Sequence, residues 1–275
     1  MGPEPGELQP LVDLIVAAAE RALADAKPTI RAQIVLDVRK IDDAGRRLRR
    51  LLSEVPAGGV TPAGRHEVNN ALNHLLGYGE LLLDEPDAAP IGDPLRAIVQ
   101  AARRLRALLH EEDPRAPAEA APPAPPASAD AASVLIVDDD PINRDLLTRH
   151  LTSRGHRALS MEHGRWAIEI LETEHVDLIL LDLDMPQMNG YETLERLKAD
   201  ARLAAIPVVV VSAADRADVV IRCVRLGAED YVAKPLDPAV LCARVAVAVA
   251  RKRERDRERA YVRELEQRVQ RPAPS

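Results

Sequence analysis

A stretch rich in proline and alanine, residues 113–132, divides the chain into two parts with different hydrophobic patterns. Its sequence, DPRAPAEAAPPAPPASADAA, has no apolar periodicity, which is typical of an extended linker between domains. A chain of 275 residues is also long enough for two domains of ordinary size. We therefore predict two structured parts joined by this linker.

The overall composition excludes several classes of protein. Aromatic residues make up only 2% of the chain and the formal net charge is −7, which argues against proteins that bind nucleic acids through stacking aromatics or a basic surface. No run of about 18 uncharged apolar residues occurs, so we expect no membrane-spanning helix. The two cysteines, Cys223 and Cys242, lack the C-x-x-C spacing of a zinc site. We expect a cytoplasmic protein.

Upstream of the linker, apolar residues recur with the period of amphipathic helices. The pattern predicts helices over residues 7–26, 29–55, 62–84 and 93–111. In the third of them, Val68, Leu72 and Leu75 form a seam suited to a helical bundle. We predict an all-α part with N-terminal helices in 1–55 and a helical hairpin in 61–112. The pattern does not decide whether the N-terminal helices join the hairpin or dock elsewhere.

Downstream of the linker, short apolar runs alternate with helical stretches. The runs predict strands over residues 133–137, 157–160, 177–181, 208–211 and 230–232. Runs such as VLIV, LILL and VVVV are apolar throughout, as expected of parallel strands buried on both faces. We predict a flavodoxin-like α/β domain with a five-stranded parallel sheet over 133–250. A charged helix and tail over 251–275 would follow, with a weak apolar seam at Val262, Leu265 and Val269.

Acidic residues follow two of the predicted strands at the point where each strand ends. Asp138, Asp139 and Asp140 come directly after VLIV, and Asp182 comes directly after LILL. Because the carboxyl ends of parallel strands meet at one edge of a sheet, these acids should converge. A hard cation makes such a cluster tolerable, and an all-oxygen site suits Mg²⁺. Alternatively, Asp138 to Asp140 simply cap the helix that starts near Pro141.

Two further polar residues are predicted at the same edge. Ser212 ends the fourth strand in VVVVS, and Lys234 follows the fifth strand in DYVAKP. Acids, a hydroxyl and an ammonium together describe a phosphoryl site. The oxygens of a phosphoryl group on Asp182 would be shared among Mg²⁺, Lys234 and Ser212. This combination favours a phosphoryl site over simple helix capping.

Four separated motifs carry a family resemblance. VLIVDDDPINR, LILLDLDMPQMNGYE, PVVVVSA and GAEDYVAKP occur in the order and spacing of a response-regulator receiver domain, which residues 133–249 resemble. The resemblance implies Asp182 as the phosphoacceptor and Asp138 with Asp139 as the acidic Mg²⁺ pair. It also implies Asp182 itself and the backbone carbonyl of Asp184 as further metal ligands.

The same resemblance assigns roles to the polar residues of the last two strands. It implies Ser212 as the switch hydroxyl and Lys234 as the lysine that senses the phosphoryl group. Tyr231 is either the aromatic residue whose rotamer follows the phosphorylation state or an ordinary strand residue with an exposed hydroxyl.

A histidine in the third predicted helix is the other candidate site. His66 lies two residues before Val68, so at 3.6 residues per turn it points away from the packed seam. A single surface histidine has little meaning. The segment HEVNNALNHLLGYGELL, however, resembles the H-box of the dimerisation and histidine-phosphotransfer domain of sensor histidine kinases, over about residues 64–111. This resemblance implies His66 as phosphoacceptor, Glu67 as its acid/base partner and a four-helix bundle made from two chains.

Some residues depart from that pattern or compete with it. Ala71 stands where the family usually has proline, and this bears on the geometry of phosphotransfer more than on His66 itself. His74 is a competing histidine without a following glutamate. Other histidines, His150 among them, are interpreted as ordinary surface residues.

The sequence contains no phosphate-binding loop such as G-x-x-x-x-G-K-[ST], so we expect no ATP binding and phosphotransfer only. The predicted function is two-component signal transduction, with a histidine kinase or another phosphorelay protein as partner and homodimerisation through the helical part. The alternative is a non-catalytic dimeric scaffold, or the regulatory module of a nucleotide cyclase or phosphatase output, in which His66 is inert.

Overall fold

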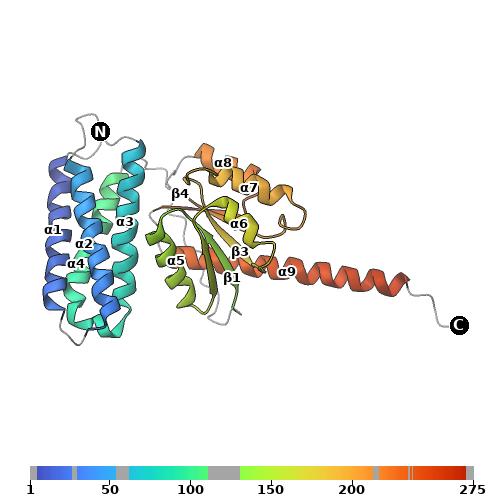
Figure 1. Cartoon of the computed structure of the whole chain (residues 1–275), viewed down its shortest axis with the longest axis horizontal. Coiled ribbons are helices and arrows are strands. Elements are labelled where there is room, and N and C mark those ends of the chain that lie inside the picture. Colours follow the sequence, from blue (N-terminus) through green and yellow to red (C-terminus); the bar gives the residue numbers. More distant parts are fainter. Residues whose placement is uncertain are drawn as a thin grey trace.

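The computed structural model describes residues 5–26, 30–53, 62–110, 131–212, 217–234, 236 and 238–270. Within these ranges the structure describes the backbone but not the side chains of a few residues, His66 among them. The linker predicted at 113–132 falls outside it except for its last two residues. The described residues form a helical bundle beside an α/β domain, with a long helix that projects away from both (Figure 1).

The bundle contains four helices of one chain. These are α1 (Pro5–Asp25), α2 (Ala32–Ser53), α3 (Pro62–Leu83) and α4 (Gly92–His110), with a 3₁₀ turn, η1 (Pro86–Ile91), before α4. Each helix contacts its neighbours, and one continuous apolar core runs through all four. The N-terminal helices therefore join the predicted hairpin. A bundle completed within one chain differs from the two-chain bundle that the resemblance implies, and homodimerisation stays a prediction.

The seam predicted in α3 belongs to this core. Leu72 and Leu75 are fully buried, and Val68 is almost so. Gly79 lets α4 approach closely, because an added Cβ there would lie 2.6 Å from Cγ2 of Val99. The apolar spacing and this glycine together explain why α3 and α4 pack side by side.

The α/β domain is built on a five-stranded parallel sheet with the strand order β2-β1-β3-β4-β5. Its strands are β1 (Ser133–Val137), β2 (Arg157–Met161), β3 (Leu178–Asp182), β4 (Val208–Ser212) and β5 (Asp230–Ala233). Its helices are α5 (Pro141–Thr152), α6 (Gly164–Ile170), α7 (Gly190–Ala199), α8 (Ala217–Arg225) and α9 (Pro238–Gln270). The predicted fold class is confirmed.

Alternate residues of the central strands serve two different cores. Val134 and Ile136 of β1 belong to a core with residues of α5 and α9, whereas Leu135 and Val137 belong to a second core with residues of α6, α7 and α8. Successive side chains of a strand point to opposite faces, so a strand covered on both faces must be apolar at every position. The packing of helices on both faces of the sheet thus explains why runs such as VLIV are apolar at every position.

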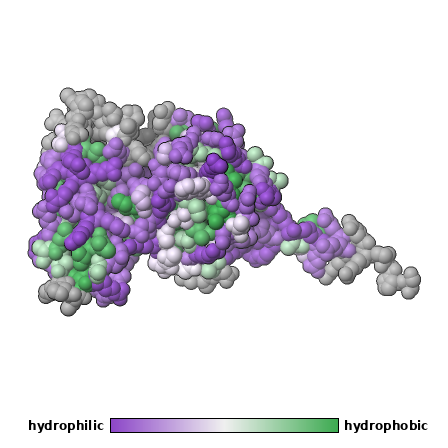
Figure 2. All heavy atoms as spheres, in the orientation of Figure 1, coloured by the Kyte–Doolittle hydropathy of each residue, from purple (hydrophilic) through white to green (hydrophobic). Residues whose placement is uncertain are grey.

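The last helix, α9, begins against the sheet, in the core that it shares with α5, and continues well beyond the domain (Figure 1). Figure 2 shows mainly hydrophilic residues along its projecting part. Tyr261, Val262 and Leu265 are exposed there. Among the described helices, none has a stretch both long and apolar enough to cross a lipid bilayer.

One sequence interpretation is wrong. His150, expected at the surface, is buried near the end of α5 and is only 7% exposed. Burial, followed by the positive charge of Arg154, lowers the pKa of its imidazole to about 4, although the charge of Asp84 acts in the opposite direction. The neutral form of His150 is therefore part of the folded structure at neutral pH.

This burial predicts a specific loss of stability in acid. The unfolded chain binds the His150 proton more tightly than the folded chain, so stability falls as the pH drops from about 6.5 to about 4. Between pH 7.5 and pH 4 the wild type should lose about 3 kcal/mol more unfolding free energy than His150→Gln. Urea denaturation of both proteins measures this difference, and equal losses would show that His150 does not titrate in this way.

Candidate functional site

The charged and polar residues predicted at the sheet edge come together where the strands end. Asp138 follows β1, Asp182 is the last residue of β3, Ser212 is the last residue of β4, and Lys234 follows β5. The parallel register places the ends of these strands side by side, since Val137 pairs with Leu181 and Asp182 pairs with Val211. The convergence thus results directly from the topology.

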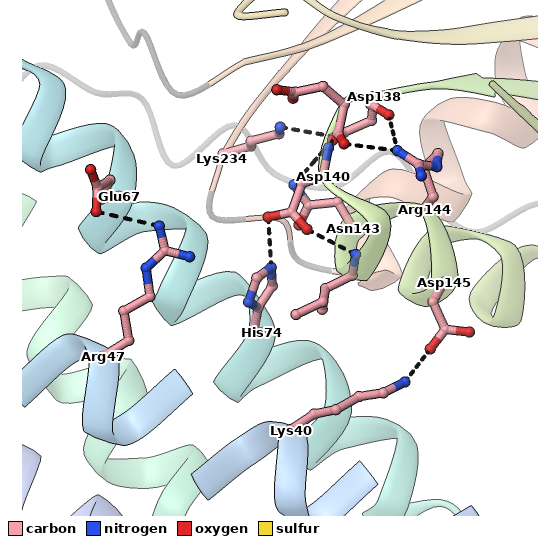
Figure 3. A network of polar contacts seen from close by, with 12 residues as sticks. Lys40, Arg47, Glu67, His74, Asp138, Asp140, Asn143, Arg144, Asp145 and Lys234 are labelled. Atoms are coloured by element: carbon pink, nitrogen blue, oxygen red, sulfur yellow. Dashed lines mark hydrogen bonds and ion pairs between the residues drawn. The ribbon is translucent and has the colours of Figure 1, made fainter. Parts of the chain in front are cut away.

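Lys234 lies between two buried carboxylates. Its Nζ is 2.7 Å from Oδ2 of Asp182 and 3.0 Å from Oδ2 of Asp138 (Figure 3 shows the contact with Asp138). The side chains of all three are at most 2% exposed. A buried ammonium with two buried carboxylate partners is held by charge as well as by hydrogen bonds.

The pKa values reflect this mutual dependence. Burial and, to a lesser extent, the nearby charge of Asp138 raise the pKa of Asp182 to about 6, against the lowering effect of Lys234. Burial alone would lower the pKa of Lys234, but the two carboxylates outweigh it and raise the pKa above its usual value. Burial and Asp138 raise the pKa of Asp139 as well. The site therefore holds more negative charge than Lys234 alone balances.

Three carboxylates of this site could hold a metal ion. Asp138, Asp139 and Asp182 each offer an oxygen, and the three oxygens lie within 4.8 Å of one another. An all-carboxylate donor set fits a hard divalent cation. The net charge of the three acids and Lys234 also makes binding of a cation favourable. The residues present therefore fit a metal site.

Asp184 and Ser212 lie beside the acidic triad. The backbone N–H of Asp184 donates to Oδ1 of Asp182 at 3.3 Å, which turns the chain after β3 around that carboxylate. The hydroxyl of Ser212 donates to Oδ2 of Asp184 at 3.4 Å and is fully buried. Tyr231 is half-buried on β5. Both predicted roles for its side chain stay predictions.

Sequence reasoning missed the residues that orient the acids. Asn143 of α5 is buried and donates to both carboxylate oxygens of Asp138 at 3.3 and 3.4 Å. Arg144 donates to the backbone carbonyls of Asp138 and Asp139 at 2.7 and 2.9 Å. Both residues lie in the first turn of the helix that comes after the acids. The polar residues at the end of the motif VLIVDDDPINR, shortly after the acids, were the feature of the sequence that could have indicated this role.

Asp140 has the capping role that the sequence left open. Its Oδ1 accepts a hydrogen bond from the backbone N–H of Ile142 at 2.8 Å, and it caps α5. Burial raises its pKa, but His74 and the backbone N–H groups of Ile142 and Asn143 outweigh this effect and lower it to about 2. Helix capping and an acidic site thus coexist, because Asp140 performs the first and its two predecessors belong to the second.

The histidine helix is placed differently from the strand-end residues. His66 lies in α3, and its side chain is outside the described residues. Glu67 forms an ion pair with Arg47 of α2 at 3.3 Å (Figure 3). His74 is buried, and its Nε2 lies 3.3 Å from Oδ2 of Asp140. Of these residues, His74 is therefore the one whose side chain the structure brings to the α/β domain.

Comparison with known proteins identifies the α/β domain. Residues 134–246 match the family described as response regulator receiver domain. The chain belongs to this family. A two-component response regulator of Oryza sativa subsp. japonica, ORR5, is 39% identical over 119 residues, which cover 42% of this chain and 89% of that protein. Protein PilH of Pseudomonas aeruginosa is 37% identical over 110 residues, which cover 40% of this chain and 91% of PilH.

Among solved structures, the signal receiver domain of a histidine kinase from Syntrophus aciditrophicus is 32% identical, with a TM-score of 0.42, over 44% of this chain and 91% of that one. The receiver match ends at the α/β domain, and the four-helix bundle has no family assignment. Membership of the receiver family therefore assigns no role to the bundle.

The buried charges of the receiver domain predict a large effect of removing Lys234. Lys234→Met leaves two buried carboxylates without their cation, so the free energy of unfolding should fall by about 3–5 kcal/mol. Urea denaturation without divalent ions measures this change. Arg196→Met, which removes an exposed ion pair with Glu192, serves as control and should change stability by less than about 1 kcal/mol. Equal effects of the two substitutions would contradict this role of Lys234.

Proposed function

We propose that the receiver domain accepts a phosphoryl group on Asp182 with the help of Mg²⁺, and that the protein acts in two-component signal transduction in the cytoplasm. The observation that carries the proposal is the buried Asp182 carboxylate within the acidic triad, 2.7 Å from the ammonium of Lys234. A nucleophile, a cation-binding cluster and a fixed positive charge are what phosphoryl transfer to a carboxylate requires.

The proposed reaction uses residues already in place. A carboxylate oxygen of Asp182 attacks phosphorus and forms the new P–O bond. When the donor is a phosphohistidine of a histidine kinase or another phosphorelay protein, the P–N bond breaks, and the imidazole nitrogen keeps the electron pair and takes up a proton. Lys234 Nζ, beside the reacting carboxylate, would pair with a phosphoryl oxygen. Ser212 ends the neighbouring strand β4, and its hydroxyl would donate a hydrogen bond to another phosphoryl oxygen.

Asp138, Asp139 and Asp182, with the backbone carbonyl of Asp184, would hold Mg²⁺, which supplies positive charge to the phosphoryl oxygens. Asn143 orients the Asp138 carboxylate toward this place through its two hydrogen bonds. The pKa of Asp182 near 6 leaves its carboxylate mostly ionised at neutral pH, as a nucleophile must be.

The receiver proposal predicts where phosphate is incorporated. Incubation of the whole chain with acetyl phosphate and Mg²⁺ should add one phosphoryl group, detected by intact mass. Asp182→Ala should abolish the addition, and Asp139→Ala should reduce it at least about tenfold because a metal ligand is lost. Incorporation that persists in Asp182→Ala, or that does not depend on Mg²⁺, would contradict the assignment.

For the helical bundle we propose that His66 takes part in phosphotransfer, with Glu67 as its acid/base partner, and that the bundle mediates homodimerisation. The support is the H-box resemblance and the position of His66 on the same helix as His74, which contacts the receiver domain. The second candidate is a regulatory bundle in which His66 is inert. The contact between α3 and the receiver domain favours that candidate, since such contact needs no chemistry at His66.

One experiment separates the two candidates. The whole chain is incubated with an active histidine kinase, ATP and Mg²⁺, and acid-labile phosphoramidate on histidine is measured by mass spectrometry. Phosphotransfer predicts a signal in wild type that disappears in His66→Ala and remains in His110→Ala, another histidine of the bundle. A signal unchanged in His66→Ala would leave the regulatory candidate.

A further inference from the structure

Helix α5 presents two apolar faces to two different parts of the molecule. Leu147 and Leu151 belong to the core beneath the sheet. Leu146 belongs instead to the apolar core of the bundle, and Ile142 packs against that core. Residues four apart lie on the same face of a helix, so each pair marks one face. The bundle thus covers the face of α5 that is turned away from the sheet.

Ion pairs surround this apolar contact. Arg149 Nη1 lies 2.6 Å from Oδ2 of Asp37 on α2, and Lys40 Nζ lies 2.8 Å from Oδ2 of Asp145 (Figure 3 shows the second pair). The hydroxyl of Tyr78 donates to the same Asp145 oxygen at 2.7 Å. Burial and the Asp145 hydrogen bond raise the pKa of Tyr78, so its hydroxyl stays protonated and donates. Because Asp37 and Tyr78 are buried, the Arg149–Asp37 ion pair and the Tyr78–Asp145 hydrogen bond are partly shielded from solvent and should contribute more than exposed ion pairs.

Two contacts from α3 reach the segments that carry the acidic site. Asn73 Oδ1 accepts a hydrogen bond from the backbone N–H of Leu236 at 2.7 Å, and Leu236 is two residues after Lys234. The neighbouring His74 lies against Asp140, directly after the acids of β1 (Figure 3). Helix α3 therefore contacts both the segment after β1, which carries the acids, and the segment after β5, which carries Lys234.

We propose that the bundle is a cis-acting regulatory domain whose docking on α5 opposes phosphorylation of Asp182. In the docked arrangement, Lys234 bridges Asp138 and Asp182. A phosphoryl group on Asp182 removes the charge of its carboxylate and places negative charge on the phosphoryl oxygens, so the ammonium has to shift from the carboxylate to a phosphoryl oxygen. The segment leading to Leu236 has to shift with it. The Asn73 hydrogen bond restrains that segment, and docking thus stabilises the unphosphorylated arrangement.

The coupling must act in both directions. If docking disfavours phosphorylation of Asp182, phosphorylation must weaken docking by the same free energy. The phosphorylated protein should then release α3 from α5 and expose the face around Leu146. This inference rests on Asp182 being the phosphoacceptor.

Two substitutions of different chemistry test the coupling in the whole chain. A Cβ added at Gly77 would lie 2.8 Å from Cδ1 of Leu146, and its nearest neighbours are all atoms of Leu146. Gly77→Leu thus places bulk in the interface while leucine favours the helix more than glycine does. Asp145→Lys sets a positive charge against Lys40 and Arg149. The matched control, Glu169→Lys, makes the same charge change at an exposed ion pair of α6.

The readouts are the initial rate of phosphorylation by acetyl phosphate with Mg²⁺, from intact mass, and amide hydrogen exchange of residues 73–78 and 142–150. In both interface variants the rate should rise about fivefold or more, and the two segments should exchange faster. Glu169→Lys should behave as wild type. In wild type, phosphorylation should speed up exchange in the same two segments.

Each failure has a distinct meaning. Absence of label on Asp182 in the wild type and in both interface variants would overturn the proposed function itself. Label on Asp182 with a rate that is unchanged or lower in the variants, although their interface exchanges faster, would overturn the coupling alone. An interface that stays protected in both variants would also overturn it, because these contacts would then not hold the bundle in place.

Discussion

A single buried ammonium makes the functional edge of the receiver domain possible. Lys234 lies within hydrogen-bonding distance of Asp138 and Asp182, and without it the two carboxylates would be buried with no cation. Asp139 adds a third negative charge, so at neutral pH the ionised site has a net charge of about −2, which one divalent cation would neutralise. The same excess of negative charge that opposes folding thus favours binding of a divalent cation, which transfer of a phosphoryl group would require.

The topology of the sheet brings these charged side chains together at one edge. Strands that are apolar at every position must be covered on both faces, as the strands of parallel α/β sheets are. The parallel order then places the ends of β1, β3, β4 and β5 at one edge. Both steps can be predicted from local patterns, since VLIV, LILL and VVVV indicate buried strands and the polar residues come directly after them. That is why the positions of Asp138, Asp182, Ser212 and Lys234 could be predicted from the sequence.

Other features depend on contacts that no local pattern reveals. The sequence of α5 does not show that its apolar residues divide between two partners, with Leu146 in one core and Leu147 in another. Arg149 finds its partner in Asp37, 112 residues earlier, and neither charge signals the other. The interpretation of His150 was wrong for the same reason, since its burial arises only when α5 is covered. The assembly of four helices within one chain likewise depends on tertiary packing of α1 and α2.

The proposed chemistry requires that the carboxylates at this edge bind a divalent cation in the folded chain. The most direct measurement is a Mg²⁺ titration of the whole protein followed by backbone amide resonances in NMR spectra. We expect saturable shifts concentrated at residues 138–140 and 182–184, which disappear in a folded Asp139→Asn variant. Resonances of these residues that do not move with Mg²⁺, or that move equally in the variant, would contradict the proposed metal site.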